Sequence, residues 1–178
     1  IANEFPVMAA IGQSNNNYTT VQLARYVTAV ANGGTVYQYT LLNRLEDSDG
    51  NVLQTFEPQV RNQIDVLDTE EWNAIHSGMR MVVENLSVFK DFPVAVAGKT
   101  GTAQQVTTRA NHALFVGFAP YDNPQISVMT RIAYGYTSHN AADVSKDILS
   151  YYFKEQSAEE LLNGQAKNVN GSSNTFTD

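Results

Sequence analysis

Apolar residues recur at helical spacing in three segments of the chain. The spacing predicts helices at residues 20–32, 69–85 and 140–153. Thr19 with Gln22, and Asp68 with Glu71, match the capping box that begins a helix, because each pair can satisfy two free backbone N–H groups. The side chains expected to face the core are Leu23, Tyr26, Val27, Val30 and Ala31 on the first helix, Trp72, Ile75, Met79, Val82 and Val83 on the second, and Val144, Ile148, Leu149 and Tyr152 on the third.

The segments between the helices have the composition of strands. Extended stretches are expected at residues 35–46, 51–57, 94–106, 112–119 and 125–134. Asp47-Ser48-Asp49-Gly50 predicts a hairpin turn between the first two stretches, and short linkers make the last three antiparallel neighbours. The order of elements therefore predicts an α/β fold of the mixed α+β kind, in which helices sandwich an antiparallel sheet.

A sheet of three meandering strands leaves its edges and part of one face without cover. We therefore expect an upstream part of the same domain to complete the sheet, with residues 1–155 as the C-terminal portion of that domain. The start at Ile1 rather than Met fits a piece of a longer protein. Residues 1–155 by themselves are expected to be poorly soluble or loosely packed. Residues 156–178, rich in Asn, Ser and Gly, predict a disordered polar tail with a weak helical turn at 159–162.

Composition excludes several classes of function. The net charge is −7, whereas a nucleic-acid partner requires a basic surface, so no such partner is expected. The chain has no cysteine, which excludes disulfides, thiolate metal sites and cysteine nucleophiles. No apolar run approaches the ~20 residues of a membrane span. His76, His112 and His139 are scattered and lack carboxylates at ligand spacing, so neither a metal nor another cofactor is expected.

The segment that points to chemistry is a predicted strand with two glycines, a lysine and two hydroxyls. Thr100 and Thr102 share one face of this strand, whereas Lys99 and Gly101 lie on the other. Such a strand beside a cleft can offer backbone N–H groups and hydroxyls to an extended peptide that ends in a carboxylate. A phosphate-binding loop would need glycine in place of Pro93 and a helix afterwards, so the Gly-Lys-Thr string is not interpreted as one.

Lys99-Thr100-Gly101-Thr102 resembles the Lys-Thr-Gly motif of penicillin-binding proteins and serine β-lactamases. Other segments, in the same order, resemble class B, high-molecular-mass transpeptidases. These segments are Ala10-Ile11-Gly12-Gln13, Ala97-Gly98, Ala103-Gln104 and residues 112–120. The resemblance covers residues 8–154 and is slightly greater to elongation-type than to division-type members. It implies the β-lactamase/transpeptidase-like fold with the N-terminal part of the domain missing.

The resemblance implies a peptidoglycan D,D-transpeptidase, which cross-links the cell wall. In this family a serine of a Ser-x-x-Lys motif attacks the D-Ala-D-Ala end of a stem peptide, and an amine from a neighbouring stem then releases the acyl group. β-Lactams acylate the same serine. Carried over to this chain, Lys99 would support the catalytic groups, and Thr100, Gly101 and Thr102 would form the substrate-binding strand. The hydroxyls would hold the substrate carboxylate, and the Thr102 N–H would be one oxyanion-hole donor.

The resemblance also implies partners and a location. The partners are peptidoglycan stem peptides, the lipid-linked precursor, β-lactams, a membrane glycosyltransferase and the upstream part of the same domain. The parent protein would be anchored in the cell membrane by a segment outside this sequence. This domain would then lie on the extracytoplasmic face.

The chain departs from the family pattern, which runs Ser-x-x-Lys, Ser-x-Asn, Lys-Thr-Gly. Ser87-Val88-Phe89-Lys90 fits the first pattern, and Ser14-Asn15-Asn16 and Ser172-Ser173-Asn174 fit the second. We do not interpret them as catalytic, because Ser87 lies between a helix and a strand rather than at the start of a buried helix. The chain alone is therefore predicted to be inactive. Two alternatives stay open: a hydrolytic D,D-carboxypeptidase or β-lactamase, and a non-catalytic β-lactam sensor or scaffold.

Other polar residues near the motif have two interpretations each. Arg109 either recruits substrate carboxylates or is a solvated loop charge, and His112 either lines the cleft or is structural. Tyr134-Gly135-Tyr136 either shapes the cleft or forms a turn with surface aromatics. His76 is expected to be half-exposed on its helix, and His139 to lie in an exposed turn.

Overall fold

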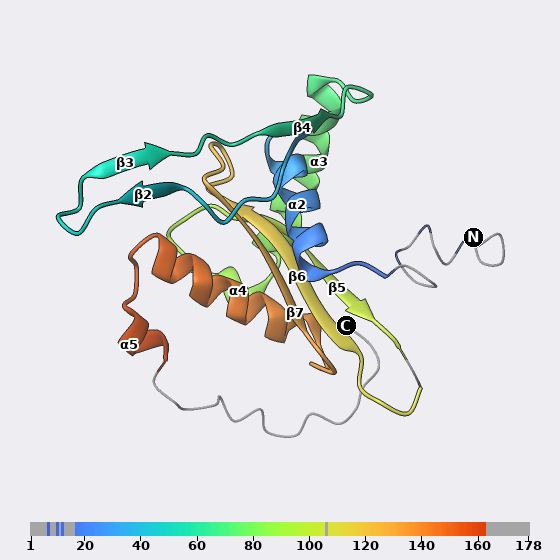
Figure 1. Ribbon diagram of the computed structural model, residues 1–178. Coiled ribbons are helices and arrows are strands. Elements are labelled where there is room, and N and C mark those ends of the chain that lie inside the picture. Colours follow the sequence, from blue (N-terminus) through green and yellow to red (C-terminus); the bar gives the residue numbers. More distant parts are fainter. Residues whose placement is uncertain (1–6, 8–9, 11, 13–16, 106, 163–178) are drawn as a thin grey trace.

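A three-stranded antiparallel sheet lies at the centre of the computed structural model, which describes residues 7, 10, 12, 17–105 and 107–162 (Figure 1). Its strands are β5 (Ala97–Ala103), β6 (His112–Ala119) and β7 (Ile126–Ile132), with β6 in the middle. Both ladders run without a register shift, from Ala97↔Phe118 to Ala103↔His112 and from Ala113↔Ile132 to Ala119↔Ile126. Side chains that pair across the ladders therefore share one face of the sheet.

Helices cover the two faces of this sheet (Figure 1). Helix α4 (Ser138–Tyr152) packs on the face that carries Phe115 and Thr130. Helices α2 (Thr20–Ala31) and α3 (Thr69–Glu84) pack on the opposite face. There the Thr28 and Ser127 hydroxyls lie 2.6 Å apart, and the His76 ring contacts Phe118 edge-on. The predicted mixed α+β sandwich is confirmed.

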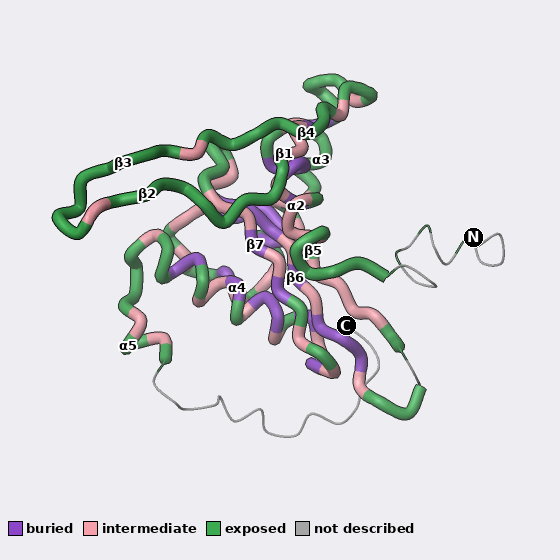
Figure 2. The backbone as a smooth tube through the Cα atoms, in the orientation of Figure 1, coloured by how far each residue is buried: buried purple, intermediate pink, exposed green. Residues whose placement is uncertain are grey.

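The larger core lies between β6 and α4, where buried residues gather in Figure 2. Phe115, Ala141, Ala142 and Leu149 have no exposed surface. The short 3₁₀ helix η1 (Ser87–Phe89) closes one end of this core, because Phe89 packs against Phe115 with ring centroids 5.4 Å apart. A smaller core on the other face contains Ala31, Ala97 and Phe118.

Both predicted capping boxes are present. Thr19 Oγ1 accepts the Gln22 N–H at 3.2 Å, and Gln22 Oε1 accepts the Thr19 N–H at 2.8 Å. Asp68 and Glu71 make the same reciprocal pair, at 2.9 and 2.8 Å. Helix α4 begins at Ser138, two residues before its predicted start, because Thr137 provides the N-cap. The predicted helical turn after residue 156 is α5 (Ala158–Leu161).

The expectation of one continuous strand at 35–46 is wrong. The segment forms two short strands, β1 (Thr35–Tyr37) and β2 (Arg44–Glu46). Strand β2 pairs with β3 (Val52–Thr55) through the predicted turn, whereas β1 pairs with a strand that was not predicted, β4 (Val60–Gln63). All four residues of β4 are exposed, so its sequence carries no alternation of apolar and polar side chains.

The predicted buried face of α4 is also wrong in part. Leu149 is buried, but Val144, Ile148 and Tyr152 are 42%, 44% and 46% exposed. Small residues face the sheet instead, and they let α4 approach it closely. The Ser145 hydroxyl donates to Thr130 Oγ1 at 2.7 Å, an arrangement that alternation of apolar residues does not reveal. Tyr26 and Ile75, also predicted to be buried, are exposed as well.

Several predictions fall on residues that the structure does not describe. Ile11, Gln13, Val106, the Ser14-Asn15-Asn16 and Ser172-Ser173-Asn174 patterns and the tail beyond residue 162 lie outside the described residues. Within the described part of the chain, no helix has both the length and the apolar composition needed to cross a membrane.

Candidate active site

Strand β5 places the Lys-Thr-Gly-Thr motif at a border of the sheet. Among the described residues β5 pairs with β6 alone, so its other edge is not covered by a strand. The start of β5 is fixed from α3, because Arg80 Nη1 donates to the Val96 carbonyl at 2.8 Å. The end of β5 is paired as far as Ala103↔His112. An extended peptide could add to such an edge by main-chain hydrogen bonds.

Lys99 lies on the sheet face that α2 and α3 cover. It pairs across the ladders with Val116 and Met129, and its Nζ donates to the Thr100 carbonyl at 2.8 Å. Lys99 also lines a cavity of about 340 Å³ between the helices and the sheet. The other lining residues are Tyr26, Val27, Val30, Ile75, Gly78, Met79, Val82 and Val116. The Lys99 side chain thus borders a hollow whose other lining residues are almost entirely apolar.

The two hydroxyls of the motif lie on the opposite face. Thr100 pairs with Phe115, and Thr102 with Ala113, so both are on the side of α4. Both are half-buried. The register therefore agrees with the predicted alternation: the strand separates the lysine from the two threonines. Lys99 and the two threonines therefore lie on opposite faces of the sheet. One ligand could contact all three only along the edge of β5 that no described strand covers.

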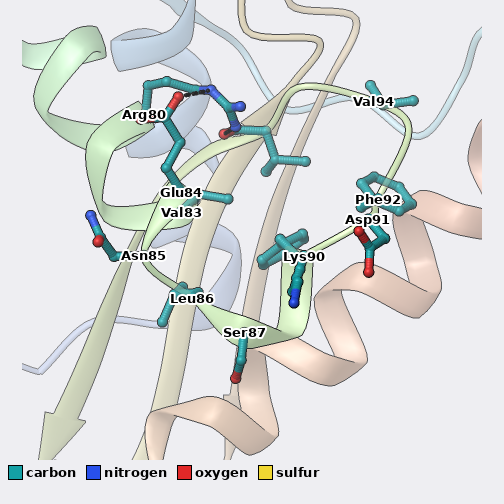
Figure 3. A pocket seen from close by; sticks show the side chains of 12 residues that line it. Arg80, Val83, Glu84, Asn85, Leu86, Ser87, Lys90, Asp91, Phe92 and Val94 are labelled. Atoms are coloured by element: carbon teal, nitrogen blue, oxygen red, sulfur yellow. Dashed lines mark hydrogen bonds and ion pairs between the residues drawn. The ribbon is translucent and has the colours of Figure 1, made fainter.

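The Ser87-x-x-Lys90 pattern lies elsewhere. Both residues belong to a cavity of about 540 Å³ beside η1, which Figure 3 shows with the Arg80–Glu84 ion pair at 3.2 Å on its border. Ser87 begins the 3₁₀ helix and Lys90 follows it. Both side chains are exposed. The Lys90 backbone N–H donates to the Ser87 carbonyl at 3.2 Å, but among the described residues no side-chain hydrogen bond joins the two. A serine activated by a lysine would need the two groups within hydrogen-bond reach.

The remaining candidates are held by neighbours. Arg109 is exposed in the connection between β5 and β6, and its Nη1 donates to the Tyr134 hydroxyl at 2.9 Å. His112 is 8% exposed and is bonded to Gln105 and Tyr134. His76 Nε2 lies 2.7 Å from the Val30 carbonyl and joins α3 to α2. His139 is exposed as predicted, but it lies in the first turn of α4 and not in a turn before the helix, because Thr137 caps the helix two residues earlier. The described residues include no group of three or more His, Asp or Glu that could hold a metal ion.

A helix-covered antiparallel sheet with Lys-Thr-Gly-Thr on its edge strand defines a class of protein, the transpeptidase fold of penicillin-binding proteins. Comparison of sequences supports the same assignment. The model of the family described as penicillin binding protein transpeptidase domain matches residues 5–150. The chain belongs to this family.

Curated relatives give the same result. Peptidoglycan D,D-transpeptidase MrdA of Haemophilus influenzae is 30% identical over 171 residues, which are 84% of this chain and 26% of that protein. Penicillin-binding protein 2A of Bacillus subtilis is 28% identical over 181 residues, which are 89% of this chain and 25% of that protein. The chain therefore spans about a quarter of the length of these relatives.

Solved structures agree in fold. Penicillin-binding protein A of Mycobacterium tuberculosis, as its imipenem acyl-enzyme complex, has a TM-score of 0.72 and 22% identity, with 84% of this chain and 35% of that chain covered. Penicillin-binding protein 2B of Streptococcus pneumoniae has a TM-score of 0.68 and 27% identity, with 79% of this chain and 25% of that chain covered. The expected transpeptidase fold is thereby confirmed.

Proposed function

We propose that residues 1–155 are the C-terminal portion of a serine D,D-transpeptidase domain that cross-links peptidoglycan and is acylated by β-lactams. The observation that carries the proposal is the Lys-Thr-Gly-Thr motif on the free edge of β5. The relative named peptidoglycan D,D-transpeptidase supports the activity. The acyl-enzyme complex of the Mycobacterium tuberculosis neighbour supports acylation by β-lactams.

In this proposal the motif residues bind substrate rather than attack it. Lys99 is a positive charge beside an apolar hollow, where it acts more strongly on a nearby nucleophile or carboxylate than in open water. Thr100 and Thr102 offer hydroxyls to a terminal carboxylate along the open edge, and Gly101 leaves that edge without a side chain. The chemistry needed from this strand is therefore positioning and electrostatic stabilisation.

The serine nucleophile is proposed to come from an upstream part of the same domain. The chain covers only about a quarter of the length of its relatives, and the position of Ser87 in a 3₁₀ helix, with an exposed side chain, argues against a nucleophile there. This chain alone would then be inactive. The uncovered edge of β5 is the border at which the upstream part would complete the site.

Further partners follow from the relatives. One structural neighbour belongs to a peptidoglycan synthase complex described as coordinating polymerization and crosslinking. By analogy we propose that the partner of the parent protein is a membrane glycosyltransferase, which supplies the glycan strand from a lipid-linked precursor. The stem peptides on that strand would be the substrates of the transpeptidase. The parent protein would sit in the cell membrane with this domain on the extracytoplasmic face.

The test is the intact mass after incubation with a penicillin, for this chain and for the longer protein that contains it. We expect one penicilloyl adduct on the longer protein, at a serine upstream of residue 1, and none on this chain. An adduct on Ser87 would show that the nucleophile lies in this chain. No adduct on either protein would contradict the proposed acylation. Product analysis with a stem peptide and an amine acceptor then separates transfer from hydrolysis.

A further inference from the structure

Beyond the motif, several polar groups surround His112, the first residue of β6, which pairs with the last residue of β5. The ring is buried and stacks on Tyr134, with ring centroids 4.9 Å apart. His112 Nδ1 accepts the Tyr134 backbone N–H at 3.1 Å, and Nε2 lies 3.1 Å from Gln105 Oε1. The Tyr134 hydroxyl donates to the same Gln105 oxygen at 3.1 Å and accepts from Arg109 Nη1 at 2.9 Å.

These partners determine the form of the ring. The Tyr134 N–H is a donor, so Nδ1 must be free of a proton, and the neutral ring then carries its proton on Nε2, which faces the Gln105 Oε1 acceptor. His112 is therefore neutral and protonated on Nε2. Arg131 Nη2, which can only donate, also lies 3.3 Å from Nε2 and 3.5 Å from Nδ1. A second proton would go on Nδ1, where it would face the Tyr134 N–H and break that hydrogen bond.

The bonded groups come from three places in the chain. Gln105 lies two residues beyond the end of β5, Arg109 precedes β6, and Tyr134 lies in the turn after β7 with φ of 54°. A tyrosine at positive φ is strained, so this turn persists only where its neighbours hold it. His112 Nδ1 holds the Tyr134 backbone N–H of this turn, and His112 Nε2 fixes the Gln105 side chain.

We propose that His112 is a positioning residue for the substrate-binding strand. In its neutral form it joins Gln105 to Tyr134 and so fixes the segment that follows β5, with Gln105 three residues from Thr102. The predicted effect on acylation rests on the proposed function, whereas the contacts around His112 do not depend on that function. His112 is buried and both of its ring nitrogens face groups of the protein itself, so it acts through β5 rather than on substrate.

Proton binding should weaken this arrangement. Three charged or titratable groups lie around the ring: Arg131 from β7, Arg109 from the β5–β6 connection and Tyr134 from the turn after β7. Among the described residues, Arg131 is the charged group that acts on His112 directly, with its Nη2 3.3 Å from Nε2. Burial, and then the Arg131 charge, lower the pKa of His112 from its usual value of 6.5. The unfolded chain therefore binds this proton more readily, and stability is lost as the pH falls through about 6.5 toward the lower folded pKa.

The test uses the longer protein and three variants. His112→Phe keeps a ring for stacking but removes both hydrogen bonds. His112→Asn keeps an acceptor and a donor and cannot titrate. His139→Asn is the matched control, because His139 is exposed and is not one of the groups around His112. Two quantities are measured: the second-order rate of acylation by a penicillin, and the rate of trypsin cleavage after Arg109, followed by mass spectrometry.

We expect His112→Phe to acylate roughly 10- to 100-fold more slowly, since a small misplacement of binding groups has effects of that size. Cleavage after Arg109 should be faster in the same variant. His112→Asn and His139→Asn should behave like the wild type near pH 7.5, and from there to about pH 5 the His112→Asn protein should lose less activity than the wild type.

Wild-type acylation and cleavage in His112→Phe would overturn the inference. If His112→Phe does not fold, the His112→Asn protein decides: a pH profile identical to that of the wild type overturns the inference, and a flatter one supports it. If none of the proteins is acylated, the proposed function fails, and the cleavage rates after Arg109 still decide whether His112 holds the segment that follows β5.

Discussion

At the scale of single residues, Lys99 combines an exposed charge with a mostly apolar setting. Its ammonium donates to the neighbouring Thr100 carbonyl, and the side chain lines the cavity between α2, α3 and the sheet. Water that leaves this cavity when another segment or a ligand enters would strengthen the field of the charge. The side chain is thus placed to act on a group that arrives from outside the described residues.

We expect Lys99→Ala to lower the acylation rate of the longer protein by about 100-fold, the usual effect of removing one group that stabilises the transition state. Stopped-flow measurement with a reporter β-lactam gives the rate. Lys90→Ala is the matched control, because Lys90 is an exposed lysine in the rejected Ser87-x-x-Lys90 pattern. Equal losses in both variants would contradict the assignment of Lys99.

At the scale of elements, the pairing of β5 with β6 depends on two glycines opposite each other. Gly98 pairs with Gly117, and the Phe115 ring lies against both. A Cβ on Gly98 would lie 2.5 Å from Phe115 Cζ and 2.7 Å from the Val116 carbonyl oxygen. These glycines make room for the buried Phe115 ring, whereas a Cβ on Gly101 would only contact Leu114.

Gly98→Ala should therefore lower the free energy of unfolding by roughly 1–3 kcal/mol, the usual cost of overpacking. Chemical denaturation of the longer protein measures it. Gly101→Ala is the control in the same strand, since its Cβ would lie 3.5 Å from Leu114 Cβ, an ordinary contact. We expect that control to stay within about 0.5 kcal/mol of the wild type. A Gly98→Ala protein as stable as the control would show that Phe115 can move away.

Elements with local signals were the ones that could be predicted. The caps at Thr19 and Asp68 depend on residues three positions apart, and the turn at 47–50 on its own sequence. Strand β4 could not be predicted, because it is exposed and its partner β1 lies more than 20 residues earlier. Likewise, the motif residues could be found from the sequence, but the bonds around His112 join residues from three separate segments.

At the scale of the whole molecule, no described residue covers the apolar surface that lies on the two sides of the sheet. On one side are Val144, Ile148 and Tyr152 of α4, and on the other is the cavity between α2 and α3. Large exposed apolar patches usually mark a surface that something else covers. The unpaired strand edges predicted from the sequence indicated that another part of the domain must cover the sheet. The apolar spacing of α4, however, wrongly assigned these three residues to the internal core.

The outer side of α4 offers a direct test of the proposed upstream part. Ile148→Asp should lower the free energy of unfolding of the longer protein by about 2 kcal/mol or more, since a covered face would have to bury an unpaired carboxylate. Leu41→Asp is the matched control, because Leu41 lies between β1 and β2 and is fully exposed. Thermal unfolding of both variants gives the comparison. If Ile148→Asp is as harmless as Leu41→Asp, water covers this face in the longer protein too, and the upstream part must pack elsewhere.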